Sequence, residues 1–168
     1  MTISEGTTVD TSGDAFNLSS DAEITFEDET TAGATITGVT NGIDARNKGT
    51  DALSITTTVT TTGTSDYGIS ATNSAAGTSL TINAATTKGG VHGIFAVNNG
   101  IGALSITTTG DTEGTTGDGI RAVNRGTDLT INAAETEGGE NGIRAKHFGT
   151  GALSITTTGK TTGGTGHG

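Results

Sequence analysis

Two short patterns of alternating apolar and small polar residues recur along the chain. The first is Gly-Ile-x-Ala, and its copies begin at Gly42, Gly68, Gly93, Gly119 and Gly142. The second is Leu-[Ser/Thr]-Ile, which follows each copy of the first, at Leu53, Leu80, Leu104, Leu129 and Leu153. Because successive side chains of a strand point to opposite faces, each pattern predicts a short strand with one buried face.

A third short segment precedes each new Gly-Ile pair, at residues 60–63, 86–89, 112–114 and 136–138. Three strands and three bends fill a period of about 25 residues, and a fixed period of this size indicates a solenoid. The predicted fold is therefore all-β: a right-handed, single-stranded parallel β-helix of about six coils. The handedness is expected from the rule for parallel crossovers, and the glycines are expected to supply positive φ at the corners.

A longer repeat is superimposed on the first. Leu-Ser-Ile-Thr-Thr-Thr at residues 53, 104 and 153 alternates with Leu-Thr-Ile-Asn-Ala-Ala at residues 80 and 129. The repeating unit is thus a pair of coils, which indicates duplication of a two-coil segment.

The two ends of the repeat are irregular. Residues 1–33 are interpreted as a degenerate N-terminal coil or cap region, in which Phe16 and Ile24 stand where later coils have Ile43 and Leu53. Residues 34–168 form the tandem coils. Gly168 matches Gly93 in the repeat, so we expect the array to be truncated at its C-terminal end, with an exposed last coil.

Composition narrows the classes of function. Gly is abundant, Pro and Cys are absent, and only 3% of residues are aromatic, which by itself is also compatible with disorder; the regular period argues against that alternative. A formal net charge of −10 argues against a nucleic-acid partner. The chain has neither an apolar run long enough to insert in a membrane nor an N-terminal signal pattern.

Asparagine follows the first strand of successive coils at one fixed position. The four residues are Asn47, Asn73, Asn98 and Asn124. Their parity places them inward at a corner, where stacked amides can bond along the axis and satisfy the backbone of the bend. We interpret them as a structural ladder, with a ligand-binding row of amides as the alternative. His147 takes the fifth place.

The succession Gly-Ile-x-Ala-x-Asn, a Gly-Thr turn, and then Ala-Leu-Ser-Ile-Thr-Thr-Thr-Gly resembles the repeats of bacterial autotransporter passenger domains over residues 34–168. That family displays β-helical stalks on the cell surface, and many of its members are adhesins. The resemblance implies a non-catalytic stalk or adhesion segment located outside the cell. No segment of this sequence resembles the family's membrane barrel or an inserted enzyme domain.

Catalytic groups are not arranged as a recognisable site. There is no Cys and no Gly-x-Ser-x-Gly motif, and His92 and His167 stand before a Gly of the repeat, as corner residues do. One outward row reads Asp44, Ser70, Phe95, Arg121, Arg144, and the next reads Arg46, Thr72, Val97, Val123, Lys146. Neither row pairs carboxylates as glycosidases do. We expect no enzyme activity and no cofactor, and keep a carbohydrate-active β-helix enzyme as an alternative.

A metal site is not expected either. The acidic run Glu27-Asp28-Glu29 has the ligand type that Ca²⁺ prefers, but no calcium-loop spacing surrounds it. We interpret this run as solvated surface of the end coil.

Phe95, Val97 and Val123 are expected to point outward on adjacent coils, beside Arg121 and Arg144. We call these five residues the apolar patch. Exposed apolar residues edged by cations are typical of a partner surface. The expected partner is a host cell or matrix protein, a glycan, or a neighbouring passenger chain; the alternative is that a covering segment of the same protein occupies the patch.

Hydroxyl rows mark another face. Outward Ser and Thr recur on alternate coils, at residues 54, 56 and 58, at 105, 107 and 109, and at 154, 156 and 158. Regular Thr rows resemble those of ice-binding proteins, although Asn83, Ala85, Asn132 and Ala134 interrupt them on the coils between. Ice binding is therefore a second alternative function.

Overall fold

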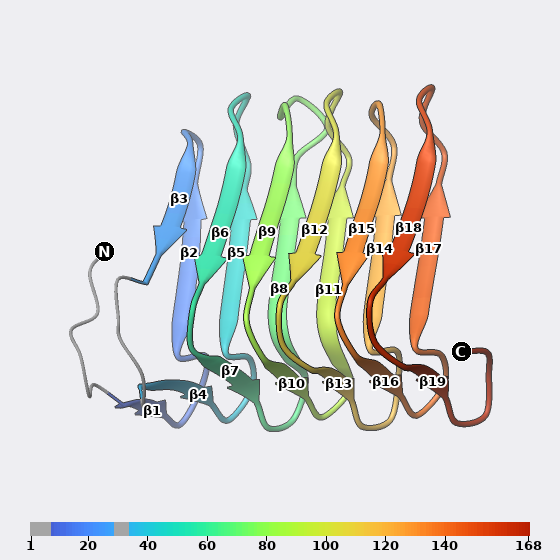
Figure 1. Ribbon diagram of the computed structural model, residues 1–168. Coiled ribbons are helices and arrows are strands. Elements are labelled where there is room, and N and C mark those ends of the chain that lie inside the picture. The colour runs from blue at the N-terminus through green and yellow to red at the C-terminus, as the bar shows by residue number, and fades with distance from the viewer. Residues whose placement is uncertain (1–7, 29–33) are drawn as a thin grey trace.

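The computed structural model describes residues 8–28 and 34–168, and all regular structure in these residues is β. The chain is a parallel β-solenoid of about six coils of about 25 residues, as predicted from the repeat. Each coil contributes one strand to each of three parallel sheets, which enclose a narrow interior (Figure 1). The position of any side chain on the surface is therefore given by its coil and by the sheet or bend in which it stands.

Three sheets, called A, B and C in the order in which each coil visits them, run the length of the rod. Sheet A contains β1 (Thr8–Thr11), β4 (Thr35–Gly38), β7 (Thr60–Gly63), β10 (Thr87–Gly89), β13 (Thr112–Gly114), β16 (Thr136–Gly138) and β19 (Thr161–Gly163). Sheet B contains β2 (Phe16–Ser20), β5 (Ile43–Asn47), β8 (Tyr67–Asn73), β11 (His92–Asn98), β14 (Ile120–Asn124) and β17 (Ile143–His147). Sheet C contains β3 (Ile24–Glu27), β6 (Leu53–Thr57), β9 (Leu80–Ala84), β12 (Leu104–Thr108), β15 (Leu129–Ala133) and β18 (Leu153–Thr157).

The register of these strands is that of the sequence repeat. Ile43 of β5 pairs with Ile69 of β8, and Leu53 of β6 pairs with Leu80 of β9. The alignment expected for the first coil is also confirmed, because Phe16 pairs with Ile43. Every coil therefore repeats its neighbour's backbone geometry, and equivalent side chains form columns along the axis.

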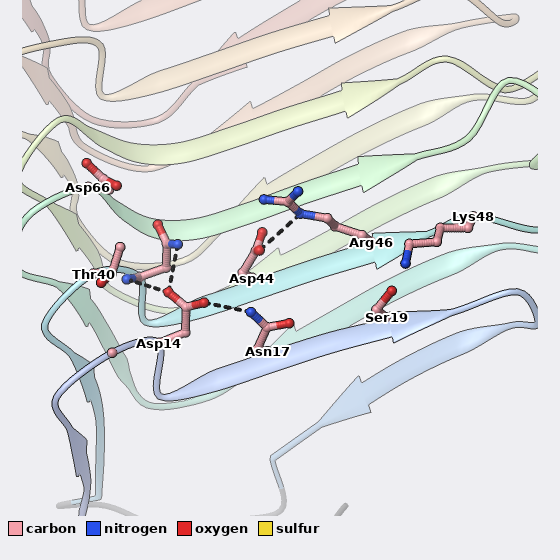
Figure 2. Close-up of a pocket in the computed structure, with 10 residues that line it drawn as sticks. Asp14, Asn17, Ser19, Thr40, Asp44, Arg46, Lys48 and Asp66 are labelled. Atoms are coloured by element: carbon pink, nitrogen blue, oxygen red, sulfur yellow. Dashed lines mark hydrogen bonds and ion pairs between the residues drawn. The ribbon is translucent and has the colours of Figure 1, made fainter.

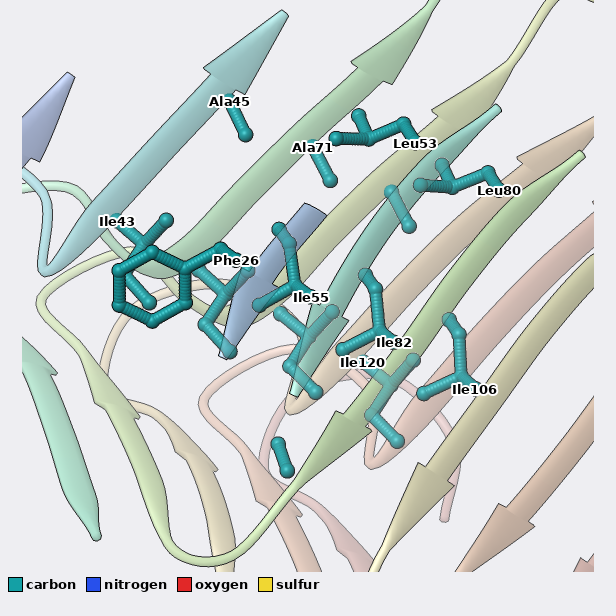
Figure 3. Close-up of a cluster of buried hydrophobic side chains, with 14 of the residues drawn as sticks. Phe26, Ile43, Ala45, Leu53, Ile55, Ala71, Leu80, Ile82, Ile106 and Ile120 are labelled. Atoms are coloured by element: carbon teal, nitrogen blue, oxygen red, sulfur yellow. The ribbon is translucent and has the colours of Figure 1, made fainter. Parts of the chain in front are cut away.

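The interior is filled by columns of aliphatic side chains. Ile and Ala of sheet B face Leu and Ile of sheet C, and from the second to the fifth coil these residues are fully buried (Figure 3). In the first coil, aromatic rings replace two aliphatic positions: Phe16 and Phe26 lie with ring centroids 5.0 Å apart. Larger rings fill the same column positions, so the first coil closes the core at that end.

Glycine at the corner between sheets A and B is required for a different reason than expected. None of Gly42, Gly68, Gly93, Gly119 and Gly142 has φ in the left-handed region, so the expectation of positive φ was wrong at these positions. A Cβ at Gly42 would instead lie 2.6 Å from the carbonyl oxygen of Gly68 in the next coil. Close stacking of the coils, rather than backbone conformation, excludes a side chain here.

Sheet A turns threonine inward. Thr61, Thr87, Thr112 and Thr136 are at most 1% exposed and continue the column that begins with Ile36. The hydroxyls of Thr61, Thr87 and Thr112 have no hydrogen-bond partner within the described residues. The third wall of the core is thus polar in composition and only partly satisfied.

The last coil is open on one side. Strands β17, β18 and β19 each have a neighbour on one side only, and Leu153 and Ile155 are 48% and 44% exposed. The same column positions are fully buried two coils earlier, at Leu104 and Ile106.

Candidate functional site

The outer face of sheet B carries the most varied side chains of the rod. Its first three coils form an open polar groove of about 620 Å³. The residues that line it are Gly13, Asp14, Asn17, Ser19, Thr40, Asn41, Asp44, Arg46, Lys48 and Asp66. Figure 2 shows Asp14 and Asp66 toward one end of this groove, and Arg46 and Lys48 toward the other.

Asp44 lies between the two ends. It is only 3% exposed, although it stands on the outer face of β5. The Nε of Arg46 donates to its Oδ2 at 3.0 Å, while its Oδ1 has no partner within the described residues. A buried carboxylate oxygen without a donor is unusual, and it marks the floor of the groove as a place where a donor group is missing.

The acidic end of the groove is internally bonded. Asp14 Oδ1 accepts from the backbone N–H and the side-chain amide of Asn41, and Asp14 Oδ2 accepts from Asn17. The cationic end is open: the Arg46 side chain is 61% exposed, and Lys48 is also exposed. The groove therefore separates its charges, with acceptors at the corner before β5 and cations near the end of β5.

The apolar patch lies where parity predicts, on adjacent strands, with Phe95 opposite Arg121 and Val97 opposite Val123. It is half-buried rather than open. Phe95 stacks on Tyr67 with centroids 5.1 Å apart, and the guanidinium of Arg121 lies 5.8 Å from the centre of its ring. The chain's own side chains thus cover part of this surface.

The edges of the patch are less covered. The Arg144 guanidinium lies 4.0 Å from the Glu140 carboxylate, and the Arg144 side chain is 38% exposed. Lys146 is also exposed. The largest exposed apolar side chains lie elsewhere, at the corner between sheets B and C: Ile101 is 72% exposed and Phe148 is 66% exposed. The alternation of inward and outward positions along strands could not predict the exposure of Ile101 and Phe148, because both stand in bends.

The asparagine row is continuous over four coils. The side-chain amide of Asn47 donates to Asn73 Oδ1, Asn73 to Asn98, and Asn98 to Asn124, at 2.7, 3.0 and 3.0 Å. Each amide also donates to a carbonyl of its own bend, as Asn98 does to Gly102. All four are nearly fully buried, so none presents an amide to an external ligand.

His147 takes the fifth place in this row. Its Nε2 donates to the Gly151 carbonyl at 3.0 Å, as the asparagine amides do in their own bends, but its Nδ1 has no partner in the described residues.

A second polar row, which the sequence did not reveal, lies at the corner between sheets A and B. It consists of the residue before the first Gly of each repeat, and the six residues are Asn41, Tyr67, His92, Asp118, Asn141 and His167. The backbone N–H of one residue commonly bonds to the side chain one coil earlier, as Tyr67 does to Asn41 Oδ1 at 3.1 Å and His167 to Asn141 Oδ1 at 2.9 Å. The sequence does contain a sign of this row, because each member stands directly before a Gly of the repeat. The row is hard to recognise because its residue type changes from coil to coil.

His92 and Asp118 are the ionisable members at the centre of this row. The backbone N–H of Asp118 donates to Nδ1 of His92 at 2.7 Å, and the ring stacks on Tyr67 at 5.5 Å. Burial lowers the pKa of His92 below the ordinary value, while the Asp118 carboxylate opposes this shift. Asp118 is fully buried; its Oδ1 accepts from Asn141, and its Oδ2 has no hydrogen-bond partner among the described residues.

The acidic run at the end of β3 was interpreted as solvated surface, which holds for Glu27, an exposed residue, but not for Asp28. Asp28 is 5% exposed and accepts hydrogen bonds from the backbone N–H and the hydroxyl of Thr58. Glu29 lies outside the described residues. Among the residues that the structure describes, no group of three or more His, Cys, Asp or Glu is placed to hold a metal ion.

Sheet C presents the most regular outer face. From β6 to β18 its outward positions carry only Ser, Thr, Asn and Ala, with no ionisable side chain. Asn83 and Ala85 lie in a shallow trough between the threonines of the neighbouring coils. The positions where Asn and Ala interrupt the hydroxyl rows are therefore also positions where the surface is hollowed.

Comparisons of the chain with models of protein families, with curated proteins and with solved structures find no match. Within residues 8–28 and 34–168, the fold contains no helix that is long and apolar enough to cross a membrane.

Proposed function

We propose that this chain is a non-catalytic stalk or adhesion segment of a surface-displayed bacterial protein, located outside the cell. The observation that carries this proposal is the unbroken register of three sheets over successive coils. Such a rod is stabilised collectively and holds its surface at a fixed distance from its point of attachment. The repeats' resemblance to autotransporter passenger domains supports the same role.

The distribution of variation around the rod supports adhesion in addition to spacing. On sheet B the inward positions repeat Ile and Ala, whereas the outward positions change from Asp44 to Phe95 and Arg121. A pure spacer has no reason to vary this face while the outer face of sheet C repeats. The apolar patch and the polar groove both lie on this varied face, which makes it the candidate contact surface for a host protein, a glycan or a neighbouring passenger chain.

Beads coated with the purified chain test the proposal. We expect them to bind cells or matrix more strongly than uncoated beads, and we expect the triple variant Phe95→Ser, Val97→Ser, Val123→Ser to bind less. Ile101→Ser, which removes an exposed apolar side chain from a corner, is the matched control. Equal binding by uncoated beads contradicts adhesion, and release of reducing ends from acidic polysaccharides contradicts the non-catalytic role and favours the carbohydrate-active alternative.

The uncharged outer face of sheet C favours a second candidate, ice binding. In the row that begins at Ser54, a hydroxyl recurs on every coil, at a spacing of about 4.8 Å along a parallel sheet. If this face binds ice, the chain lowers the growth temperature of an ice crystal below its melting temperature, and Thr107→Lys abolishes the effect. Thr62→Lys on the outer face of sheet A is the control. Absence of thermal hysteresis in the parent chain rejects this function.

A further inference from the structure

We propose that the polar groove on the outer face of sheet B binds an acidic sugar residue, one that carries a single carboxylate beside free hydroxyls, as a hexuronate does. The inference gives the proposed adhesion role a site and rests on that role for its biological meaning. The binding event itself is a property of the purified chain and is tested on it.

The cationic end of the groove specifies an anionic group. Arg46 on β5 and Lys48 just after the end of β5 are both exposed, and of these two only Arg46 has an ion-pair partner within the described residues. Ser19 lies across from them on β2 and adds a hydroxyl (Figure 2). Two cations with a neighbouring hydroxyl are suited to a carboxylate, since charge-assisted hydrogen bonds are the strongest that a surface groove offers.

The floor of the groove specifies hydrogen-bond donors on the same ligand. Asp44 Oδ1 is buried and lacks a donor, while its other oxygen is held by Arg46. Beyond it, the side chain of Asp66 presents a further acceptor. A ligand with hydroxyls adjacent to its carboxylate supplies donors to this part of the groove while its charge remains at Arg46 and Lys48.

The lining argues against other ligand classes. It contains no aromatic ring on which a base would stack and no apolar side chain that would receive the side chains of a peptide. The outer face of a paired sheet also offers no free backbone edge for strand addition. A polysulfated chain is disfavoured because Asp14, Asp44 and Asp66 line the groove and the protein carries a net charge of −10.

The size of the groove fits one or two sugar rings. Its lining residues come from three successive coils, which span about 10 Å along the axis at a coil spacing of about 4.8 Å. Sheet B continues beyond it to Tyr67 and Phe95, whose stacked rings lie on the same face. A longer glycan therefore has an aromatic surface available next to the groove.

The test is a titration of the ¹⁵N-labelled chain with sodium glucuronate, followed by amide chemical shifts. We expect saturable shifts at Asn17, Ser19 and Arg46, and none at the equivalent outer-face positions of the fifth and sixth coils. Glucose, glucosamine and sodium acetate at the same concentrations are the ligand controls. No saturable shift at the groove amides overturns the proposal. Equal shifts with glucose overturn the role of the carboxylate, and equal shifts with acetate overturn the role of the hydroxyls.

Variants assign the binding to named side chains. Lys48→Gln is expected to raise the dissociation constant for glucuronate about tenfold, which corresponds to loss of one charge-assisted contact. Lys146→Gln is the matched control, because Lys146 is exposed on the same face of sheet B several coils away. Arg46→Gln is informative only if its melting temperature is retained, since Arg46 also holds the buried Asp44. Equal affinity of the Lys48→Gln and Lys146→Gln variants overturns the site.

Failure of this inference is distinguishable from failure of the adhesion proposal. If beads coated with the parent chain adhere but glucuronate causes no shift, adhesion stands and the groove is not its site. If glucuronate binds in the groove but beads adhere to no surface, the site stands and adhesion does not.

Discussion

The two corners that flank sheet B provide hydrogen-bond partners for their polar groups in different ways. At the corner between sheets B and C, asparagine occupies four successive coils, and each amide is bonded to the next. At the corner between sheets A and B, the equivalent position changes from Asn41 to Tyr67, His92 and Asp118. There the bonds run mostly from the backbone N–H of one coil to a side chain of the coil before it.

The difference follows from the number of donors and acceptors on each side chain. An amide carries both, so a column of identical amides is self-complementary along the axis. A carboxylate only accepts, and a neutral imidazole has one donor and one acceptor, so neither can propagate through a column of its own kind. A solenoid with a mixed corner therefore leaves some polar atoms without a hydrogen-bond partner, as Asp118 Oδ2 is among the residues described.

The largest effect that separates the two corners is expected at Asn98. Its side chain makes four hydrogen bonds at full burial, to Gly102, Asn124, Asn73 and Gly100. Asn98→Ala orphans these partners, and we expect the free energy of unfolding to fall by about 3 kcal/mol or more.

The comparison variant is Asn41→Ala at the other corner. Within the part of the chain that the structure describes, the Asn41 side chain bonds to Asp14 and to the backbone N–H of Tyr67, so we expect a loss of about 1 to 2 kcal/mol. Denaturant unfolding of both variants measures the two losses. Equal losses would mean that the amide column has no cooperative advantage over the mixed one.

Asp118→Asn sharpens the comparison by making the mixed corner more like the amide corner. The substitution retains an acceptor for Asn141 and removes a fully buried charge. We expect stabilisation of about 1 kcal/mol. Asp118→Ala, which leaves Asn141 without that acceptor, should destabilise. Destabilisation by both variants would indicate that the charge itself is compensated.

The inward threonines of sheet A extend the contrast between satisfied and unsatisfied columns. Thr87 is fully buried and its hydroxyl has no partner in the described residues, whereas the Thr136 hydroxyl bonds to Thr161 at 3.2 Å. Replacing Thr87 with the isosteric Val is expected to stabilise the chain by about 1 kcal/mol. Thr136→Val should give no gain. A gain of equal size at both positions would show that the hydrogen bond to Thr161 contributes nothing.

The smallest effect is a pH dependence confined to the mixed corner. Because the pKa of His92 is lowered in the folded state, the unfolded chain binds the proton more tightly, and stability falls as the pH drops below about 6.5. The loss stops growing once the pH is below the folded pKa. Charged and titratable groups around the ring are Asp118, Arg121, Glu140 and Tyr67.

His92→Asn is the control for this dependence, since Asn41 and Asn141 make the equivalent bond in other coils without titrating there. Melting temperatures at pH 7.5 and 5.5 should differ more for the parent chain than for the variant. The same difference in both would assign the dependence to other groups.

The strands were predictable because the core of this fold alternates strictly. Residues 60–63, 112–114 and 136–138 were predicted from the repeat and are strands, and only β10 begins one residue later than expected, at Thr87. The inward orientation of the threonines was harder to predict, since a short strand of Thr and Gly shows no alternation of apolar and polar residues. The glycines were located correctly but explained wrongly, because coil-to-coil distance is not encoded in local sequence.

The groove was not predictable from strand parity. Asp14 and Asp66 stand in corners, where alternation no longer applies, and they approach Asp44 only through the stacking of coils. Tyr67 covers Phe95 for the same reason, since it lies at the start of β8 beside the corner. Each outward row of the repeat is a single column of side chains along the rod. The groove combines several of these columns with side chains from the corners.

The identical register of alternate coils has a consequence for how such a chain can change over time. Leu80 and Leu129 begin matching segments two coils apart, and Leu104 between them pairs with both. Joining Ser79 directly to Leu129 would remove residues 80–128 and place the strand that begins at Ile143 beside the strand that contains Ile69. The aliphatic columns would stay in register across this junction. Recombination between such near-copies can therefore shorten or lengthen the molecule by two coils, about 10 Å, at a time, and each such step removes or adds the outer-face residues of those coils together with the length.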